Sequence, residues 1–170
     1  MLSTPFWVWL SQRRSKRDAL SIGLIISLVG YLFFFFNPSD FLLGTFAAIA
    51  LIGFGGASLP VMFWAMLPDT IEYGEYRSGT RAESRTFGFA TFAQKAAVGI
   101  NALLLGALLG WSGFEANAEQ LPSTLIAMKA IMALVPAAGS IAIWGILRGY
   151  HLDRAAHDAL VRALNDRRSI

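Results

Sequence analysis

A dense group of charged side chains lies between two apolar segments, in the stretch MLPDTIEYGEYRSGTRAES from Met66 to Ser84. Carboxylates and guanidinium groups this close together favour ion pairs, and carboxylates can also act as general acids and bases. From the charges alone, three interpretations are open: a network of ion pairs, a solvated loop, or an acidic catalytic group. The candidate residues are Asp69, Glu72, Tyr73, Glu75, Arg77, Arg81 and Glu83.

Lys95 lies inside the apolar segment that follows and is the second candidate for chemistry. Its neighbours at three- and four-residue steps are small, which lets another helix approach closely and points Lys95 into a helix bundle. A Lys inside hydrocarbon costs about 2.5 to 3.5 kcal/mol on insertion scales, and such residues mark ion or substrate pathways. The alternative is snorkelling to the membrane surface. The stripe consists of Gly88, Thr91, Lys95, Gly99, Ala102, Gly106 and Gly110.

Gln94 and Asn101 form a second polar line beside this stripe. Side-chain amides inside a membrane form hydrogen bonds between helices or contact a substrate, and both interpretations are open here. We treat Lys95, Thr91 and Gln94 as the candidate residues that contact a ligand.

The sequence does not predict an enzyme. Asp69 and Glu72 are expected at or beyond the end of their helix, and no Ser–His arrangement, HExxH motif or paired aspartate lies within an apolar segment. There is no cysteine, and His151 and His157 are spaced so that they point to different faces of a helix. No cofactor and no metal site is therefore predicted.

The elements that must position these residues are membrane-spanning helices. The chain of 170 residues is 55% hydrophobic, with a mean hydropathy of +0.53 and 15% charged residues, which is more apolar than an ordinary soluble domain. A helix needs roughly 20 mostly apolar residues to cross about 30 Å of hydrocarbon. We therefore predict an all-α polytopic membrane protein with four transmembrane helices, over 20–37, 41–67, 87–111 and 124–147.

Both ends of the chain carry further elements. Met1–Leu10 is apolar but too short to span a membrane, and it lacks the flanks of a signal peptide, so we expect it to be the end of another helix. The tail over 148–170 has apolar residues at four-residue spacing among charges. This pattern predicts an amphipathic helix that lies on the membrane surface or on the helix bundle.

Outside the spans, basic residues are confined to alternate connections. They precede the first span (Arg13–Arg17), lie between the second and third (Arg77–Arg85) and follow the fourth, whereas the connections at 37–40 and 112–122 contain none. By the positive-inside rule, the basic connections and the C-terminal tail are cytoplasmic. Anionic lipid of the inner leaflet explains the pI near 9.6, and no nucleic-acid partner is predicted.

The second span contains GFGGASLP, from Gly53 to Pro60. This stretch is superficially similar to a phosphate-binding loop, but it lacks the following Lys and Ser or Thr and lies in an apolar segment. Glycines and a proline in a transmembrane helix more often permit close packing and a bend. We therefore expect an irregular helix here.

The stretch WAMLPDTIEYGEYRSGTRAES, followed by TFAQKAAVG, resembles the glycoside-pentoside-hexuronide:cation symporters, the melibiose permease family of the major facilitator superfamily. The pattern D-x-x-[DE]-Y-G-E-Y…R-x-E-S is specific, and the ending YHLDRAAHDALVRAL is similar to the C-terminus of that family. The resemblance covers essentially the whole chain but only the last third of a twelve-helix fold. It implies that the four spans are helices nine to twelve.

The resemblance implies a role for several candidate residues. Asp69 and Glu72 match the family's acidic pair, although the second position is often Asp, and Arg81 matches its gating arginine. With the neighbouring charges they would belong to a cytoplasmic network that latches two six-helix halves in the outward-facing state. Lys95 matches a membrane lysine near the cation and sugar sites, and Thr91 matches a polar position near the sugar.

The implied function is symport of a sugar or glycoside with Na⁺ or H⁺ across the cytoplasmic membrane. In the family, the cation carboxylates and much of the sugar site belong to the N-terminal half, so the chain is expected to need that half as a partner, besides membrane lipid. The alternatives are a non-transporting membrane subunit or truncated product that assembles through helix packing, and a transporter of lysolipids.

The charge distribution predicts the topology. Reporter proteins fused after Arg17, Gly79 and Arg167 should report the cytoplasm, and fusions after Pro38 and Asn117 should report the outside. Alkaline phosphatase and green fluorescent protein fusions report the two sides independently. An outside signal from Gly79 would reverse the orientation and remove the charged network from the cytoplasm.

Overall fold

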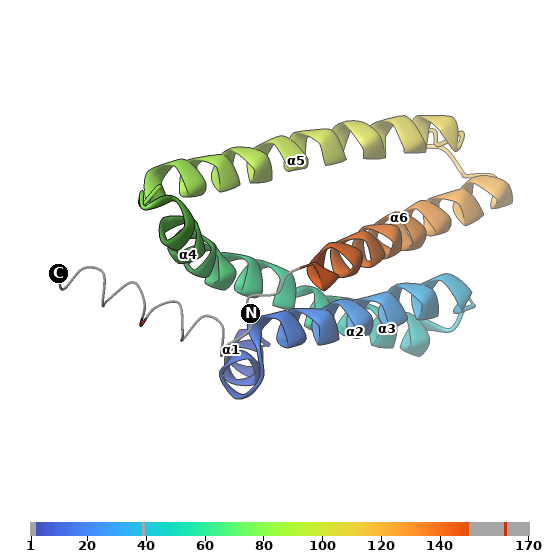
Figure 1. Cartoon of the computed structure of the whole chain (residues 1–170). Helices are drawn as coiled ribbons and strands as arrows, with labels where there is room; N and C mark the ends of the chain where they lie inside the picture. Colours follow the sequence, from blue (N-terminus) through green and yellow to red (C-terminus); the bar gives the residue numbers. More distant parts are fainter. Residues whose placement is uncertain (1–2, 39, 150–161, 163–170) are drawn as a thin grey trace.

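The computed structural model describes residues 3–38, 40–149 and 162. In these ranges the chain forms helices joined by short connections and no strand (Figure 1). The helices are α1 (Thr4–Arg13), α2 (Lys16–Phe36), α3 (Leu42–Gly56), α4 (Ser58–Ser78), α5 (Glu83–Trp111) and α6 (Pro122–Arg148).

Four described segments are long and apolar enough to cross a membrane, which confirms the predicted all-α polytopic fold. The predicted spans agree closely with them at the ends away from the basic connections. At the ends next to the basic connections, the first three membrane helices are longer than predicted. The first begins at Lys16, the second ends at Ser78 and the third begins at Glu83. Charged residues continue a helix readily, whereas hydropathy marks only the part suited to lipid. The segments are Lys16–Phe36, Leu42–Ser78, Glu83–Trp111 and Pro122–Arg148.

The start of α2 is fixed by a capping residue. Ser15 has an extended backbone, and its Oγ accepts a hydrogen bond from the N–H of Asp18 at 3.0 Å. Asp18 also places a negative charge in the first turn, where the helix dipole favours it. The cap explains why α2 begins at Lys16, before the apolar tract.

The charged stretch of α4 is helical, which corrects the expectation that its acidic residues lie at or beyond the helix end. The helix continues through Asp69 and Glu72 to Ser78. It ends at Gly79, which has a left-handed backbone (φ 71) and donates its N–H to the carbonyl of Glu75 at 2.8 Å. Glycine adopts this conformation without strain, so the helix ends where the glycine stands.

The second membrane segment is interrupted at Ala57, between α3 and α4. Pro60 lies in the first turn of α4 and has no N–H to donate to a carbonyl one turn earlier in α3. The irregularity expected at Gly53–Pro60 is therefore present. The fully buried Trp7 of α1 donates its indole N–H to the carbonyl of Phe54 at 2.9 Å, within one turn of the break.

Helix α2 packs closely against α3 and the start of α4. A Cβ added to Gly23 would lie 1.9 Å from Ser58 Oγ, and one added to Gly55 would lie 2.6 Å from the carbonyl oxygen of Gly23. These distances leave no room for a side chain. We call this contact of Gly23 and Ser27 with Gly55 and Ser58 the small-residue seam, which is the type of interface that lets helices associate in lipid.

The last helix, α6, packs along α2 (Figure 1). Near its C-terminal end, Leu147 joins Leu20 and Leu24 of α2 in a buried apolar cluster. Near its other end, the Lys129 Nζ donates a hydrogen bond to the backbone carbonyl of Asn37, at the C-terminal end of α2. These contacts attach α6 to both ends of α2.

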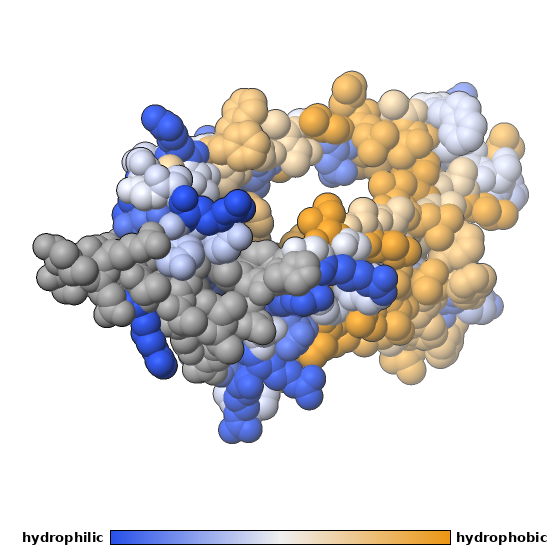
Figure 2. Space-filling model, in the orientation of Figure 1, coloured by the Kyte–Doolittle hydropathy of each residue, from blue (hydrophilic) through white to orange (hydrophobic). Residues whose placement is uncertain are grey.

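The long helix α5 stands apart from the other helices over much of its length, and the space-filling view shows an opening beside it (Figures 1 and 2). Nothing described lies within 4 Å of a Cβ added at Gly88, Gly99, Gly106 or Gly110. The close helix approach predicted for this stripe is therefore not made within the described part of the chain. The stripe remains uncovered.

Hydrophilic residues gather where α4 meets α5 and around α1, whereas apolar residues cover much of the opposite end of the helices (Figure 2). The connections without basic residues, α2 to α3 and α5 to α6, lie together at the opposite end (Figure 1). The predicted tail helix over 148–170 lies outside the described residues, apart from 148, 149 and 162.

The seam predicts opposite effects for two neighbouring glycines of α3. Gly55→Ala should destabilise the chain by about 1 to 3 kcal/mol, because the new Cβ would meet backbone atoms of Gly23 and Ser27. Gly53→Ala, with nothing within 4 Å, should be neutral or stabilising by up to about 1 kcal/mol, since alanine favours a helix. Circular dichroism during unfolding in mixed dodecyl maltoside and dodecyl sulfate micelles measures both. Equal stability of the two variants would contradict the seam.

Candidate functional site

Asp69 is held by a lysine from the start of α2. The Lys16 Nζ lies 2.7 Å from one carboxylate oxygen of Asp69 and 2.8 Å from the other, and it donates to the carbonyl of Ala65 at 2.9 Å. The Asp69 side chain is 12% exposed and the Lys16 side chain 36%. The pair is therefore partly shielded from water, where opposite charges attract more strongly than at the surface. It ties the start of α2 to the middle of α4.

Arg81 is the centre of a second charged group, at the connection between α4 and α5. Its Nε donates to Glu83 at 3.0 Å and its Nη1 to Glu75 at 3.4 Å. The hydrogen bond and charge of Glu83, with a smaller effect of Glu75, raise the pKa of Arg81 above its ordinary range. The Arg81 side chain is 46% exposed, so water and salt weaken these pairs. We call Glu75, Arg81 and Glu83 the arginine cluster.

The remaining charged candidates lie on the surface of α4. Tyr73 and Arg77 are both exposed, and the guanidinium carbon lies 5.9 Å from the centre of the tyrosine ring. Glu72 is half-buried, three residues after Asp69 on the same helix. The seven predicted residues are thus divided: Asp69 binds α2, three form the arginine cluster, and three lie along α4.

Lys95 is exposed on α5 and forms no hydrogen bond or ion pair with the described residues. Because α5 begins at Glu83, Lys95 lies about 18 Å along the helix from its first residue. The apolar part of α5 begins only at Phe87, however, and Lys95 lies about 12 Å along the helix from that residue, at the edge of the reach of a lysine stem. The Thr91 hydroxyl, one turn earlier, donates to the carbonyl of Phe87 at 2.8 Å, and its oxygen can still accept a hydrogen bond.

Gln94 lines a cavity of about 350 Å³ between α4 and α5. The Trp64 indole, also in the wall, stacks on Phe87 with the ring planes 10° apart. A single amide among apolar and aromatic side chains is typical of sites for small molecules. The lining residues are Leu59, Pro60, Phe63, Trp64, Ala90, Ala93 and Gln94.

Neither Lys16 nor Trp64 was identified from the sequence as a member of a site. Lys16 belongs to a basic run that the positive-inside rule already explains, and its partner lies 53 positions further on. Trp64 lies in an apolar span, where an aromatic side chain also suits lipid contact. Residue type alone therefore gave no signal for either contact.

Fold and site together define a helical membrane protein with charged groups at one end and polar residues inside its spans. The profile of the family described as MFS/sugar transport protein matches residues 1–154. The match covers most of the chain, so the chain belongs to this family of transporters. Membership confirms the predicted resemblance to sugar transporters of the major facilitator superfamily and the prediction that the chain is not an enzyme.

Several curated proteins are similar to the chain. It is 29% identical over 168 residues to the glucuronide carrier protein homolog of Escherichia coli (strain K12), covering 99% of this chain and 37% of that protein. It is 36% identical over 168 residues to the uncharacterized symporter YjmB of Bacillus subtilis (strain 168), covering 98% and 36%. It is 27% identical over 140 residues to the isoprimeverose transporter of Lactiplantibacillus pentosus, covering 82% and 29%. The chain spans about a third of the length of these relatives.

The different burial of the two charged groups predicts different coupling energies. A double-mutant cycle with Lys16→Gln and Asp69→Asn should give a coupling of about 1 kcal/mol that changes little with salt, because the pair is partly buried. The same cycle with Arg81→Gln and Glu83→Gln should give a smaller coupling that added salt removes. Unfolding in mixed micelles at low and high salt measures both. A stronger coupling at Arg81 would contradict this order.

Proposed function

We propose that the chain is the C-terminal part of a symporter that carries a sugar or glycoside with Na⁺ or H⁺ across the cytoplasmic membrane. Family membership and relatives named for glucuronide and isoprimeverose transport support a sugar substrate. The observation that carries the proposal is Lys95, a charged residue deep in an apolar helix and exposed on a stripe of small residues. Such a residue is costly in lipid, and a pathway for ions or substrate accounts for it.

The proposed pathway needs a second wall. Apart from the backbone of α5 itself, nothing described lies within 4 Å of a Cβ added at the glycines of the stripe, and the chain spans about a third of its relatives' length. In a major facilitator transporter the opposite wall is supplied by the N-terminal half, which is therefore the proposed partner. That half would also contribute most carboxylates for the coupling cation, and membrane lipid would cover the outer surface.

In this site Lys95 is the fixed positive charge. Its ammonium would pair with a carboxylate on the opposite wall, and the coupling cation would compete for the same carboxylate. When the coupling cation replaces the Lys95 ammonium at this carboxylate, α5 loses its ion pair with the opposite wall. Cation binding is thereby linked to the position of α5. Thr91 and Gln94 offer a hydroxyl oxygen and an amide, which are suitable partners for sugar hydroxyl groups.

The arginine cluster, with Glu72, Tyr73 and Arg77 beside it, is the proposed cytoplasmic latch. Exposed ion pairs are individually weak and exchange partners readily, so they bias a two-state rocking motion without locking it. Asp69 differs because Lys16 already binds it. We propose that this pair fixes α4 against α2, while the exposed charges near the end of α4 form ion pairs with the N-terminal half of the transporter.

The proposed location is the inner membrane, with the charged end of the bundle and the C-terminus in the cytoplasm. The basic connections all lie at one end of the helices, where anionic lipid would attract them.

The uncovered stripe of α5 also favours a second candidate, a non-transporting subunit that assembles through this helix. Assembly through small residues does not need a positive charge at Lys95. The role of that charge therefore distinguishes the two functions.

The test of the proposed function is cation-dependent sugar uptake by the intact transporter in vesicles. Lys95→Ala should abolish cation stimulation because the competing charge is lost. Lys95→Arg should fail as well, since a planar guanidinium cannot replace a compact ammonium in a close site.

The matched control is Lys129→Arg. In the native chain, the Lys129 ammonium forms its hydrogen bond, among described residues, with the backbone carbonyl of Asn37. This variant should retain coupled uptake. Coupling as in the native protein after Lys95→Ala would reject the pathway role and leave the subunit as the better interpretation.

A further inference from the structure

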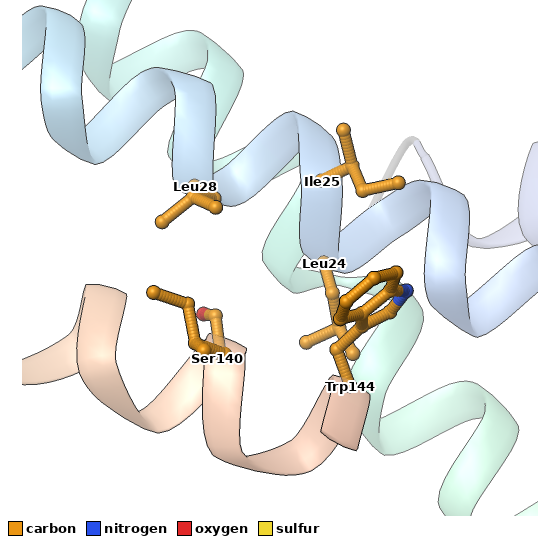
Figure 3. Close-up of a pocket in the computed structure, with 6 residues that line it drawn as sticks. Leu24, Ile25, Leu28, Ser140 and Trp144 are labelled. Carbon is orange, nitrogen blue, oxygen red and sulfur yellow. The ribbon is translucent and has the colours of Figure 1, made fainter. Parts of the chain in front are cut away.

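An apolar groove separates α2 from α6 at a place that the proposed transport site does not use (Figure 3). Leu24 faces Trp144 at one end of it, and Leu28 faces Ser140 at the other, as expected for antiparallel neighbours. We call this cavity of about 300 Å³ the α2–α6 groove. It is lined by Leu24, Ile25, Leu28, Ser140, Ile141 and Trp144.

The walls of the groove suit a hydrocarbon chain and not a sugar. Ser140 is buried, and its Oγ donates to the carbonyl of Pro136 at 3.0 Å, so the hydroxyl proton is already used. Apart from the Trp144 indole N–H, the other lining side chains are hydrocarbon. Ile25 is 49% exposed and Ile141 54%, so the groove opens to the surroundings of the helices. Sugar hydroxyl groups would lose hydrogen bonds with water here, whereas an acyl chain loses none.

A positive charge stands at one end of this groove. Arg148, the last residue of α6, is exposed, and its guanidinium carbon lies 3.8 Å from the centre of the Trp144 ring. The start of α2, with Arg17, lies at the same end, because Leu20 and Leu147 share one buried cluster. Tryptophan and arginine together at a helix end are typical of the depth of lipid headgroups.

We propose that the α2–α6 groove binds one anionic phospholipid, with its phosphate at Arg148 and an acyl chain between the two helices. The distance from Arg148 back to Ser140 is about 12 Å along α6, so a chain that starts at the guanidinium passes every lining residue of that helix. Stacking on Trp144 orients the planar guanidinium, which can bind two phosphate oxygens at once. The site depends neither on the proposed transport function nor on the proposed orientation.

The bound lipid would fill a gap beside the contact between α2 and α6. Helix α6 packs along α2, and Ala133, Ala137 and Ser140 in its middle are buried, whereas Ile25 and Ile141 of the groove stay exposed. An acyl chain in this space supplies the van der Waals contacts that the side chains do not make. Binding to the folded chain therefore raises its stability in proportion to lipid concentration.

The test is native mass spectrometry of the 170-residue chain in detergent with equimolar phosphatidylglycerol and phosphatidylethanolamine of identical acyl chains. We expect one retained lipid, predominantly phosphatidylglycerol. Arg148→Gln should lower the preference for phosphatidylglycerol about fivefold, the loss expected for one arginine near an anionic lipid. Arg77→Gln, which also removes a guanidinium beside an aromatic ring, should leave the preference unchanged.

Filling the groove separates the acyl chain site from general lipid contact. Ile141→Trp should reduce retention of both lipids, whereas Ile146→Trp, on the same helix at a side chain that is 77% exposed and outside the groove, should not. If Ile141→Trp alters the helical circular dichroism signal, lipid retention is measured instead with Leu28→Phe, which fills the groove from α2.

Three results would overturn the proposal. The first is equal retention of both lipids by the native chain. The second is unchanged retention of phosphatidylglycerol by well-folded variants that fill the groove. Displacement of the adduct by inorganic phosphate at the same concentration would likewise reject an acyl chain site, because it would show that Arg148 holds only an anion.

Discussion

The close approach of α2 and α3 is the constraint on which the other contacts depend. Lipid is as apolar as a leucine side chain, so burial of apolar surface does not hold two membrane helices together, and packing distance does. Gly23 and Gly55 leave no room for a Cβ, so the two backbones come close together. With α2 in this position, Lys16 reaches Asp69 on α4, and the neighbouring face of α2 with Leu20, Leu24 and Leu28 is available to α6.

Burial gives the two charged groups different mechanical properties. The Lys16–Asp69 pair is partly shielded and joins two helices, whereas Arg81 and Glu83 are exposed and the arginine cluster orders only the short connection between α4 and α5. A firm contact beside a loose one lets α4 keep its place while the charges at its end change partners. The break at Ala57 limits how far such a change is passed to α3, because a helix without continuous hydrogen bonds transmits bending poorly.

Sequence reasoning predicted the elements that depend on local rules. The four spans follow from the length of apolar tracts, and the irregularity near Pro60 follows from its missing N–H. The helical extension to Ser78 was not predicted, because hydropathy decreases at the charged residues although helix propensity does not. The contact of Lys16 with Asp69 depends on how α2 crosses α4, and no local pattern contains that information. The environment of Lys95 was predicted to include another helix, and the described residues do not provide it.

The contact of α6 with α2 joins the last described helix to an early one, which sets an order for biogenesis. The ribosome delivers α2 and α3 first, and their hairpin can form the small-residue seam as soon as both have left the translocon. Two contacts of α2 cannot form until α6 has been synthesised: that of Leu24 with Leu147, and that of the Asn37 carbonyl with Lys129. During this interval α5 is already inserted with few neighbours of its own. Among the described helices, α6 therefore completes the assembly, and a ribosome that stalls before α6 leaves α2 open to other membrane proteins.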